Sequence, residues 1–280
     1  MIIAGEGSNH AALAAFRVSK PTGENEMAVK KTSEISVLEV NTGRITFCLL
    51  GTSPIILNRL SEKAKGQLLF PPAKKNAAEK ASTLKHEPYP EFRASPYLSP
   101  DKNEPTLIRH LSTAFKGALR SAALDIPGAN KSQIGRLTYV PGDYVNVYGV
   151  PQMLMSVVRN SDINHTPDIR TRAIIPKWAC YVDVIFIKPI LKEQTVTNLM
   201  AAAGIMQGIG DWRPGKGSGA YGRFELVNSD NPEFLEIIKT GGRDAQTEAM
   251  DNPECHDTES EELLAWFEVE VKRRGFKVVS

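Results

Sequence analysis

The residues best suited to chemistry stand together in one glycine-rich stretch, residues 208–222, which reads GIGDWRPGKGSGAYG. Six glycines allow main-chain N–H groups to converge on an anion, because no Cβ stands in the way. Cationic side chains add charge, and two aromatic side chains offer faces on which bases stack. The residues predicted to contact a nucleic-acid backbone here are Gly210, Trp212, Arg213, Gly215, Lys216, Gly217, Gly219, Tyr221 and Arg223. The alternative is a turn that only caps a helix and begins a strand.

The same stretch nearly spells the phosphate-binding loop of NTPases, Gly-x-x-x-x-Gly-Lys-Ser/Thr, from Gly210 onward. The residue after the lysine is Gly217, so no hydroxyl stands there for magnesium. The NTPase loop follows a strand and opens a helix, whereas this loop follows an expected helix and opens a strand. Nucleotide hydrolysis is therefore not predicted.

Two further groups of cations extend the predicted surface. Arg170, Arg172 and Lys177 precede an apolar strand with few acids among them, and they predict a neighbouring stretch of groove. Lys116 and Arg120 lie on the polar side of an expected helix. The alternative for the helix is a solvated face with no ligand, because its other side carries the apolar residues.

Catalysis has only one weak candidate, His165, which lies near Asp168 and Arg170. A ribonuclease that uses no metal needs such a base, but a histidine beside an aspartate in a loop more often has a structural role. We therefore expect binding without catalysis.

The cysteines predict neither a metal site nor a disulfide framework. Cys48 and Cys180 lie in apolar runs and are expected to be buried thiols, and Cys255 with His256 falls short of a tetrahedral ligand set. No metal and no cofactor are predicted.

Composition places the chain among ordinary globular proteins, with 280 residues, 41% hydrophobic and 24% charged. It has no apolar run of about 20 residues and no signal-peptide pattern at its start, so a cytoplasmic protein of a bacterial host cell is expected. The net charge of +2 hides an asymmetry: residues 229–280 hold 13 acids and 6 bases, while residues 1–228 hold 19 acids and 28 bases. A basic body with an acidic end fits a binder of polyanions, and a solvated tail is the alternative.

Periodicity and turn signals predict alternating strands and helices. Residues 35–40 and 44–51 read as a hairpin turning at Asn-Thr-Gly, 41–43, and residues 178–187 read as a central strand with Val182, Val184 and Phe186 on one face. Helices are expected at residues 57–69, 107–124, 195–207, 232–239 and 260–274, a β-meander at 135–158 and a strand at 224–227. Trp266 and Phe267 are expected to dock the last helix on the body.

These elements predict an α+β protein in three parts. Residues 1–34 form a flexible arm, 35–228 the core, and 229–280 an acidic C-terminal region. Within the core, residues 71–105 are rich in proline and are expected to form a projecting finger.

The order of strand 178–187, helix 195–207, glycine-rich loop and short strand resembles the RAMP superfamily of CRISPR-associated proteins, and so does the segment 115–120, FKGALR. The resemblance implies an RRM/ferredoxin-like antiparallel sheet core with helices on one face, a loop that contacts RNA, and copies that line one strand as a homo-oligomer. The segments GTSP at 51–54, SEKAK at 61–65, AFK at 114–116 and IGDWRP at 209–214 resemble an uncharacterised family of tailed phages and prophages, over residues 45–227. That second resemblance implies a phage or mobile-element origin and no known activity.

The predicted function is non-catalytic binding of single-stranded RNA or DNA. A strand is read by its backbone charge and base faces, which leaves a diffuse signature in the sequence. Two alternatives remain open: a phage protein–protein interaction module that binds a host factor through the finger, and a metal-independent RAMP-like endoribonuclease that uses His165.

Overall fold

The central element of the fold is a four-stranded antiparallel sheet. The computed structural model describes residues 39–70, 84–159, 166–216 and 219–276, and residues 40–280 form one compact unit. In the order β10-β1-β9-β5, the sheet consists of β10 (Phe224–Val227), β1 (Asn41–Gly51), β9 (Ala179–Lys188) and β5 (Thr138–Tyr139). Every neighbouring pair is antiparallel.

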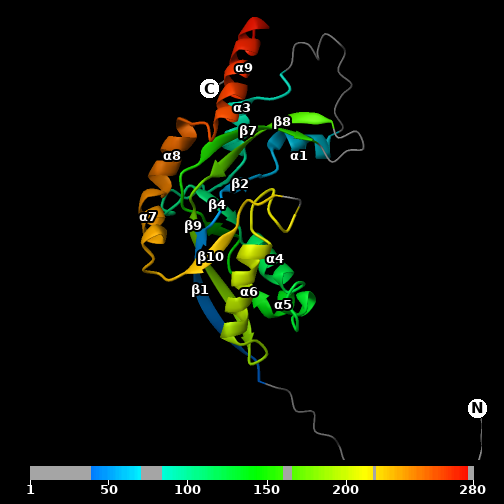
Figure 1. The fold of residues 1–280 in the computed structure, drawn as a ribbon, viewed down its shortest axis with the longest axis vertical. Helices are drawn as coiled ribbons and strands as arrows, with labels where there is room; N and C mark the ends of the chain where they lie inside the picture. The colour runs from blue at the N-terminus through cyan, green and yellow to red at the C-terminus, as the bar shows by residue number, and fades with distance from the viewer. Residues whose placement is uncertain (1–38, 71–83, 160–165, 217–218, 277–280) are drawn as a thin grey trace, which may run out of the picture. The chain divides into compact units, whose positions relative to one another are not determined.

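Two helices connect these strands across one face of the sheet. α4 (Ser112–Ala122) lies between β1 and β5 in the chain, and α6 (Glu193–Met206) joins β9 to β10. Figure 1 shows the two helices side by side. Along the chain these elements follow one another as β1, α4, β5, β9, α6 and β10. When the four strands are numbered in chain order, their order across the sheet is 4-1-3-2. This is the split βαβ arrangement of the ferredoxin-like fold, so the predicted α+β class and its ferredoxin-like core are confirmed.

The core forms between these helices and the sheet because apolar residues alternate along the strands. On β9, Val182, Val184 and Phe186 are buried toward the helices, while Tyr181 and Asp183 face the other way. The helices contribute residues at three- and four-residue spacings to the same cluster, among them Phe115, Leu119, Leu199, Met200 and Ala203. The predicted central strand and its two faces are confirmed.

Two smaller sheets extend the fold. One has the order β2 (Ile55–Leu57), β8 (Pro167–Ile175) and β7 (Gln152–Arg159), and the other β3 (Tyr97–Leu98), β4 (Ile108–Leu111) and β6 (Tyr144–Asn146). The other helices are α1 (Glu62–Leu69), α3 (Pro88–Ala94), α5 (Lys131–Leu137), α7 (Pro232–Thr240), α8 (Arg243–Asp251) and α9 (Thr258–Arg273). No helix in the described part of the chain has both the length and the apolar character that a bilayer crossing needs.

The hairpin expected near the start of the core is replaced by one long strand. Asn41, Thr42 and Gly43 continue β1 and pair with β9, where Gly43 lies opposite Phe186. A Cβ at position 43 would overlap the Phe186 ring, so the glycine serves close packing rather than a turn. The helix predicted from residue 107 begins only at Ser112, because residues 108–111 pair with β3 and β6 as β4.

The expected finger is only partly within the described residues, since 71–83 lie outside them. Its second half is packed rather than projecting: α3 lies on β8, and the Phe92 side chain is fully buried. Proline at the first turn of α3 needs no N–H there, which explains how this proline-rich segment forms a helix.

The acidic C-terminal region belongs to the same compact unit as the sheets. Phe234 and Ile237 of α7 cover Cys48 and Leu50 on the face of β1 opposite α4 and α6. In α8, the buried Gln246 side chain accepts from the N–H of Leu107 and Ile108 and donates to three carbonyl oxygens. Trp266, expected to dock α9, is instead 58% exposed, since the buried side of α9 carries Ser260 and Val271.

Candidate nucleic-acid interface

The glycine-rich loop is closed by its own backbone. Gly208, Gly210 and Gly222 have positive φ angles of 61°, 81° and 69°, a conformation that costs residues with a Cβ about 1–2 kcal/mol. The two ends of the loop meet where Ile209 N–H donates to the Gly222 carbonyl and Gly222 N–H donates to the Pro54 carbonyl. The glycines at these positions are therefore required by the fold.

Many main-chain donors of the loop already have partners inside the protein. Asp211 N–H donates to Ile56, Gly215 N–H to Gln207, and Lys216 N–H to Arg213. These groups, with the N–H groups of residues 208, 209, 221 and 222, do not form the cradle of free donors that the sequence predicted. A phosphate at this loop would have to be held mainly by side chains.

The loop presents one large aromatic surface. The Trp212 and Tyr221 rings stack on each other with centroids 6.2 Å apart and an interplanar angle of 26°. Trp212 is 50% exposed and has a φ of 49°, the sole described residue other than glycine with positive φ. A bulky residue in this conformation is a strained exception, and such exceptions gather at functional sites.

The cations of the loop divide into internal and exposed ones. Arg213 Nη1 donates to the Gly210 carbonyl at 2.7 Å, so its guanidinium stabilises the loop. Lys216 and Arg223 are exposed, and neither is in an ion pair with another described residue. Gly217 lies outside the described residues. Lys216 and Arg223 are thus the loop cations that can reach a phosphate.

The strand β8 brings Arg172 and Arg170 to the loop. Arg172 Nη1 lies 2.5 Å from Asp211 Oδ2, which also accepts from Asn58 Nδ2 at 3.1 Å. Burial lowers the pKa of Arg172, and the Asp211 charge opposes that shift. Arg172 therefore anchors the loop to the second sheet, whereas Arg170 is exposed at the edge of a groove.

This groove, of about 640 Å³, runs between residues 58–62, the approach to α3 and β8. Its cations are balanced by acids: Arg59 pairs with Glu62, and Lys85 and Arg170 lie near Asp168. A groove of balanced charge is a poor track for phosphates, so the predicted groove of Arg170 and Arg172 is adjacent to the loop but not strongly basic.

A histidine links two sides of the groove. His86 Nδ1 lies 3.0 Å from Glu91 Oε1, and Nε2 lies 2.9 Å from Asp168 Oδ1. The hydrogen bond with Glu91 is the chief cause that raises the pKa of His86 above its ordinary 6.5, and burial opposes the shift. When protonated, the imidazole joins Asp168 of β8 to Glu91 of α3.

We expect this link to make stability depend on pH. Because the pKa of His86 is higher in the folded than in the unfolded chain, its stabilising effect is complete below about 6.5 and is lost as the pH rises through the folded value. Between pH 6 and pH 8, the melting temperature of the wild type should therefore fall by more than that of His86→Gln. Equal slopes would contradict the link.

The turn after α4, the helix that carries the predicted cations Lys116 and Arg120, lies beside the loop on its other side. Gln207 Nε2 donates to Asp125 Oδ2, and Gly215 N–H donates to the Gln207 carbonyl, so the end of α4 is held next to Gly215. Lys116 and Arg120 project from α4, half-buried and exposed respectively. Neither has an ion-pair partner among the described residues.

Sequence reasoning missed two cations of α5, which packs against α4. Lys131 and Arg136 join Lys116 and Arg120 in a stretch, residues 112–140, whose one acid is Asp125. That scarcity of acids was a signal in the sequence. We call Lys116, Arg120, Lys131 and Arg136 the helix cations.

The remaining predicted residues lie elsewhere. Lys177 is exposed, and its Nζ lies 3.5 Å from Glu233 Oε1 of α7. His165 lies outside the described residues. His110 is half-buried against Phe115, burial lowers its pKa to about 4, and its Nδ1 has no hydrogen-bond partner among the described residues.

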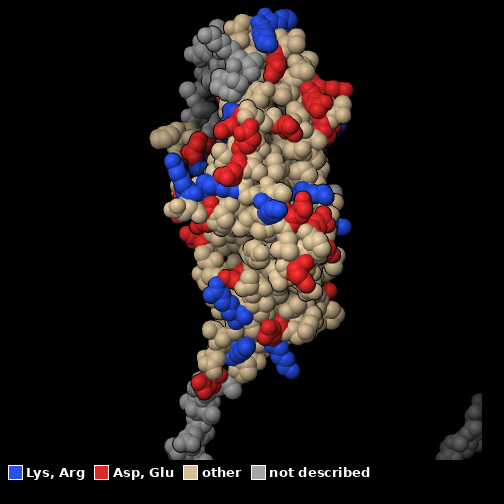
Figure 2. All heavy atoms as spheres, turned by 90° about the vertical axis from the view of Figure 1, so that its left-hand side faces the viewer, with Lys and Arg blue, Asp and Glu red and all other residues tan. Residues whose placement is uncertain are grey.

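No three His, Cys, Asp or Glu side chains of the described residues are grouped so that they could hold a metal ion. Figure 2 shows the face that carries α7 and α8, where acidic and basic side chains are intermingled without a large area of one sign. The helix cations belong to α4 and α5, not to that mixed surface. The loop and these helices define the candidate interface.

Fold and site together define an α+β protein with a ferredoxin-like sheet and a glycine-rich loop that joins α6 to β10. No family model matches the chain, and no curated protein matches it. Two solved structures are similar to parts of it. One is the cryo-EM structure of the Type III-B Cmr-beta bound to cognate target RNA, with 13% identity, 67% of this chain and 59% of that chain covered, and a TM-score of 0.36. The other is the crystal structure of Cmr6 from Pyrococcus furiosus, with 10% identity, 67% and 98% coverage, and a TM-score of 0.32.

The comparisons give no support to the predicted resemblance to the tailed-phage family. The match spans 59% of the Cmr-beta chain's length, less than two thirds. Both TM-scores lie below 0.5, so the ferredoxin-like assignment rests on the strand order of this chain itself.

Proposed function

We propose that this protein binds single-stranded nucleic acid without cleaving it, through the glycine-rich loop and the helix cations. The observation that carries the proposal is Trp212, a half-exposed aromatic side chain kept in a left-handed backbone conformation. Its ring is stacked on Tyr221 and so has a fixed orientation. A rigid, exposed aromatic face beside unpaired cations is the arrangement on which a base stacks while the backbone meets charge.

Folding alone gives little reason for tryptophan at this position. Half of its surface stays in water, and the left-handed conformation costs a residue with a Cβ about 1–2 kcal/mol. Glycine would occupy the same conformation without that strain. A tryptophan here is therefore better explained by what its ring contacts outside the protein.

The charges around Trp212 favour a polymeric anion over a small one. In the chain, Lys216 lies between the two stacked residues and Arg223 follows the second by two positions, and α4 and α5 add the helix cations. Spread over a loop and two helices, these groups would contact successive phosphates of one strand. Several copies binding side by side along a strand are part of the proposal, because such contacts repeat with every nucleotide.

The test is binding of labelled single-stranded RNA and DNA at several salt concentrations. With about four phosphate contacts, affinity should fall about 50-fold between 50 and 200 mM salt. Trp212→Gly should weaken binding about tenfold, because one base loses its stacking partner, while thermal stability stays near that of wild type.

Trp266→Ala is the matched control, since Trp266 is a similarly exposed tryptophan on α9. It should leave the affinity unchanged. Absence of binding at low salt would overturn the proposal, and cleavage of the strand would overturn its non-catalytic part. Comparing the affinities for RNA and for DNA decides which of the two is preferred. The mass of the complex formed on a long strand shows whether several copies of the protein bind side by side.

A further inference from the structure

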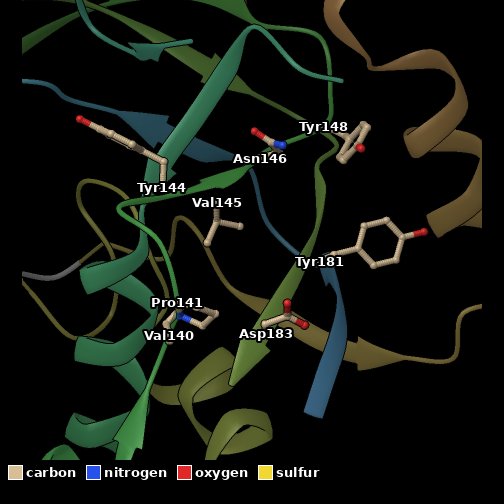
Figure 3. A pocket seen from close by; sticks show the side chains of 8 residues that line it. All are labelled: Val140, Pro141, Tyr144, Val145, Asn146, Tyr148, Tyr181 and Asp183. Atoms are coloured by element: carbon tan, nitrogen blue, oxygen red, sulfur yellow. The ribbon is translucent and has the colours of Figure 1, made fainter. Parts of the chain in front are cut away.

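The face of the four-stranded sheet opposite α4 and α6, which α7 covers in part, carries a pocket of about 210 Å³ that the proposed function does not use. β9 contributes Tyr181 and Asp183, β6 contributes Asn146, and Tyr148 and Pro141 complete the wall. Figure 3 shows Tyr148, Tyr181, Asn146 and Asp183 around one opening, while the Tyr144 ring turns away from them. The pocket is smaller than the usual site of a drug-sized ligand and open to solvent, so it suits one flat ring system.

Asp183 is a fixed hydrogen-bond acceptor in this pocket. Arg44 donates to its Oδ2, and Thr46 Oγ1 donates to its Oδ1 at 2.5 Å, both from the neighbouring strand β1. The Arg44 hydrogen bond is the first cause that lowers the pKa of Asp183, so the carboxylate is ionised at neutral pH. An ionised carboxylate offers about four acceptor positions, and these two donors occupy two of them.

The aromatic walls are fixed as well. Tyr181 makes edge-to-face contacts with Tyr148 at 6.5 Å and with Phe234 of α7 at 5.0 Å. Burial raises the pKa of both tyrosines, so their hydroxyls remain protonated donors at neutral pH. Tyr181 is 41% exposed and leaves a ring surface open to a ligand.

The charge at the pocket selects against phosphate and for N–H donors. Asn146 Nδ2 donates to Glu104 Oε2 at 2.7 Å, so a second carboxylate lies behind the amide. Asp183 and Glu104 thus place carboxylate acceptors on the side where polar atoms of a ligand would lie, although Arg44 offsets the charge of Asp183. A base whose edge carries adjacent N–H groups fits this arrangement, because one carboxylate can accept from both.

A row of arginine and tyrosine side chains in contact leads toward this pocket from the groove beside the loop. The Arg59 guanidinium, which lines the groove, lies 5.7 Å from the Tyr97 ring centroid. Tyr97 lies 5.6 Å from Tyr144, which is at the rim of the pocket and carries the Arg109 guanidinium 3.8 Å from its ring centroid. Two tyrosine rings between two guanidinium groups are side chains of the kind on which the bases of a strand stack.

We propose that the pocket binds a guanine base of the same single strand. Asp183 accepts from N1–H and from the exocyclic amine of guanine, and the Tyr181 ring contacts its face. On the Watson–Crick edge, each of the other bases has a single N–H donor group. It therefore makes fewer hydrogen bonds with the carboxylate than guanine does. This inference rests on the proposed function, because the loop and the helix cations hold the strand.

The experiment measures affinity for a short adenine oligomer and for the same oligomer with one guanine, at a fixed low salt concentration. A guanine bonded to a carboxylate should strengthen binding at least about tenfold. Inosine, which lacks the exocyclic amine, should give an intermediate affinity. Asp183→Asn, which keeps the shape, should reduce the preference to less than about threefold, whereas Glu225→Gln, an exposed change on β10, should preserve it.

Circular dichroism and melting of Asp183→Asn check that the sheet still folds, and if it does not, the inosine series in wild type tests the same hydrogen bond. Binding of all oligomers with equal affinity would overturn the guanine pocket and leave the proposed function standing. A preference for cytosine or adenine would overturn it too. Failure of every oligomer to bind would instead count against the proposed function.

Discussion

Gly222→Ala is expected to lower the free energy of unfolding by at least about 3 kcal/mol. Gly222 has a φ of 69°, and a Cβ there would overlap the Ile209 carbonyl oxygen. The residue cannot move aside, because its N–H donates to Pro54 and its carbonyl accepts from Ile209 N–H. Strain and steric overlap therefore add to each other.

Urea denaturation followed by circular dichroism measures this effect. Gly117→Ala is the matched control: Gly117 lies within α4, and a Cβ there meets nothing within 4 Å. The control should gain about 0.5–1 kcal/mol, because alanine favours the helix interior. If Gly222→Ala were as stable as wild type but failed to bind a strand, the glycine would serve ligand approach rather than loop closure.

Those parts of the sheet could be predicted from the sequence in which apolar and polar residues alternate along a single strand. Alternation along residues 179–188 revealed both faces of β9, because successive side chains of a strand point to opposite sides. The same pattern placed Tyr181 and Asp183 together on the face away from the core, although no chemistry was read from them. The hairpin predicted at Asn41–Gly43 was wrong, because a turn signal is read from neighbouring residues alone. The role of Gly43 is set by Phe186 on the adjacent strand, which the local signal does not include.

The residue types of the candidate interface could be predicted from the sequence, but the partners of the individual side chains could not. The exposure of Trp212 and Lys216 agrees with their place in a loop, since loops usually lie at the surface. The use of Arg172 and Arg213 as internal anchors does not follow, because their partners are set by how β8 and the loop meet. Residue type predicts that a cation is available, whereas tertiary contacts decide whether it faces a ligand.

Asp211→Ala is expected to cost about 2–3 kcal/mol, because it leaves Arg172 charged and without its ion-pair partner. The side chains of Arg172 and Asp211 are 14% and 24% exposed, so water compensates the lost charge only in part. Asn58 Nδ2 loses an acceptor as well. The loop should then detach from β8. The affinity for a nucleic-acid strand should fall, although removing a negative charge would by itself favour contact with phosphate.

A double-mutant cycle separates the ion pair from the general effect of either change. Arg172→Met with Asp211→Leu should be more stable than either single variant, because no unpaired charge stays in the partly buried site. The control pair is Lys177 and Glu233, which are 77% and 56% exposed and 3.5 Å apart. Removing that pair should change stability by less than about 1 kcal/mol. Additive single effects at Arg172 and Asp211 would show that the pair does not anchor the loop. Coupling of 1 kcal/mol or more would mean that the conformation presenting Trp212 depends on a contact between β8 and the loop.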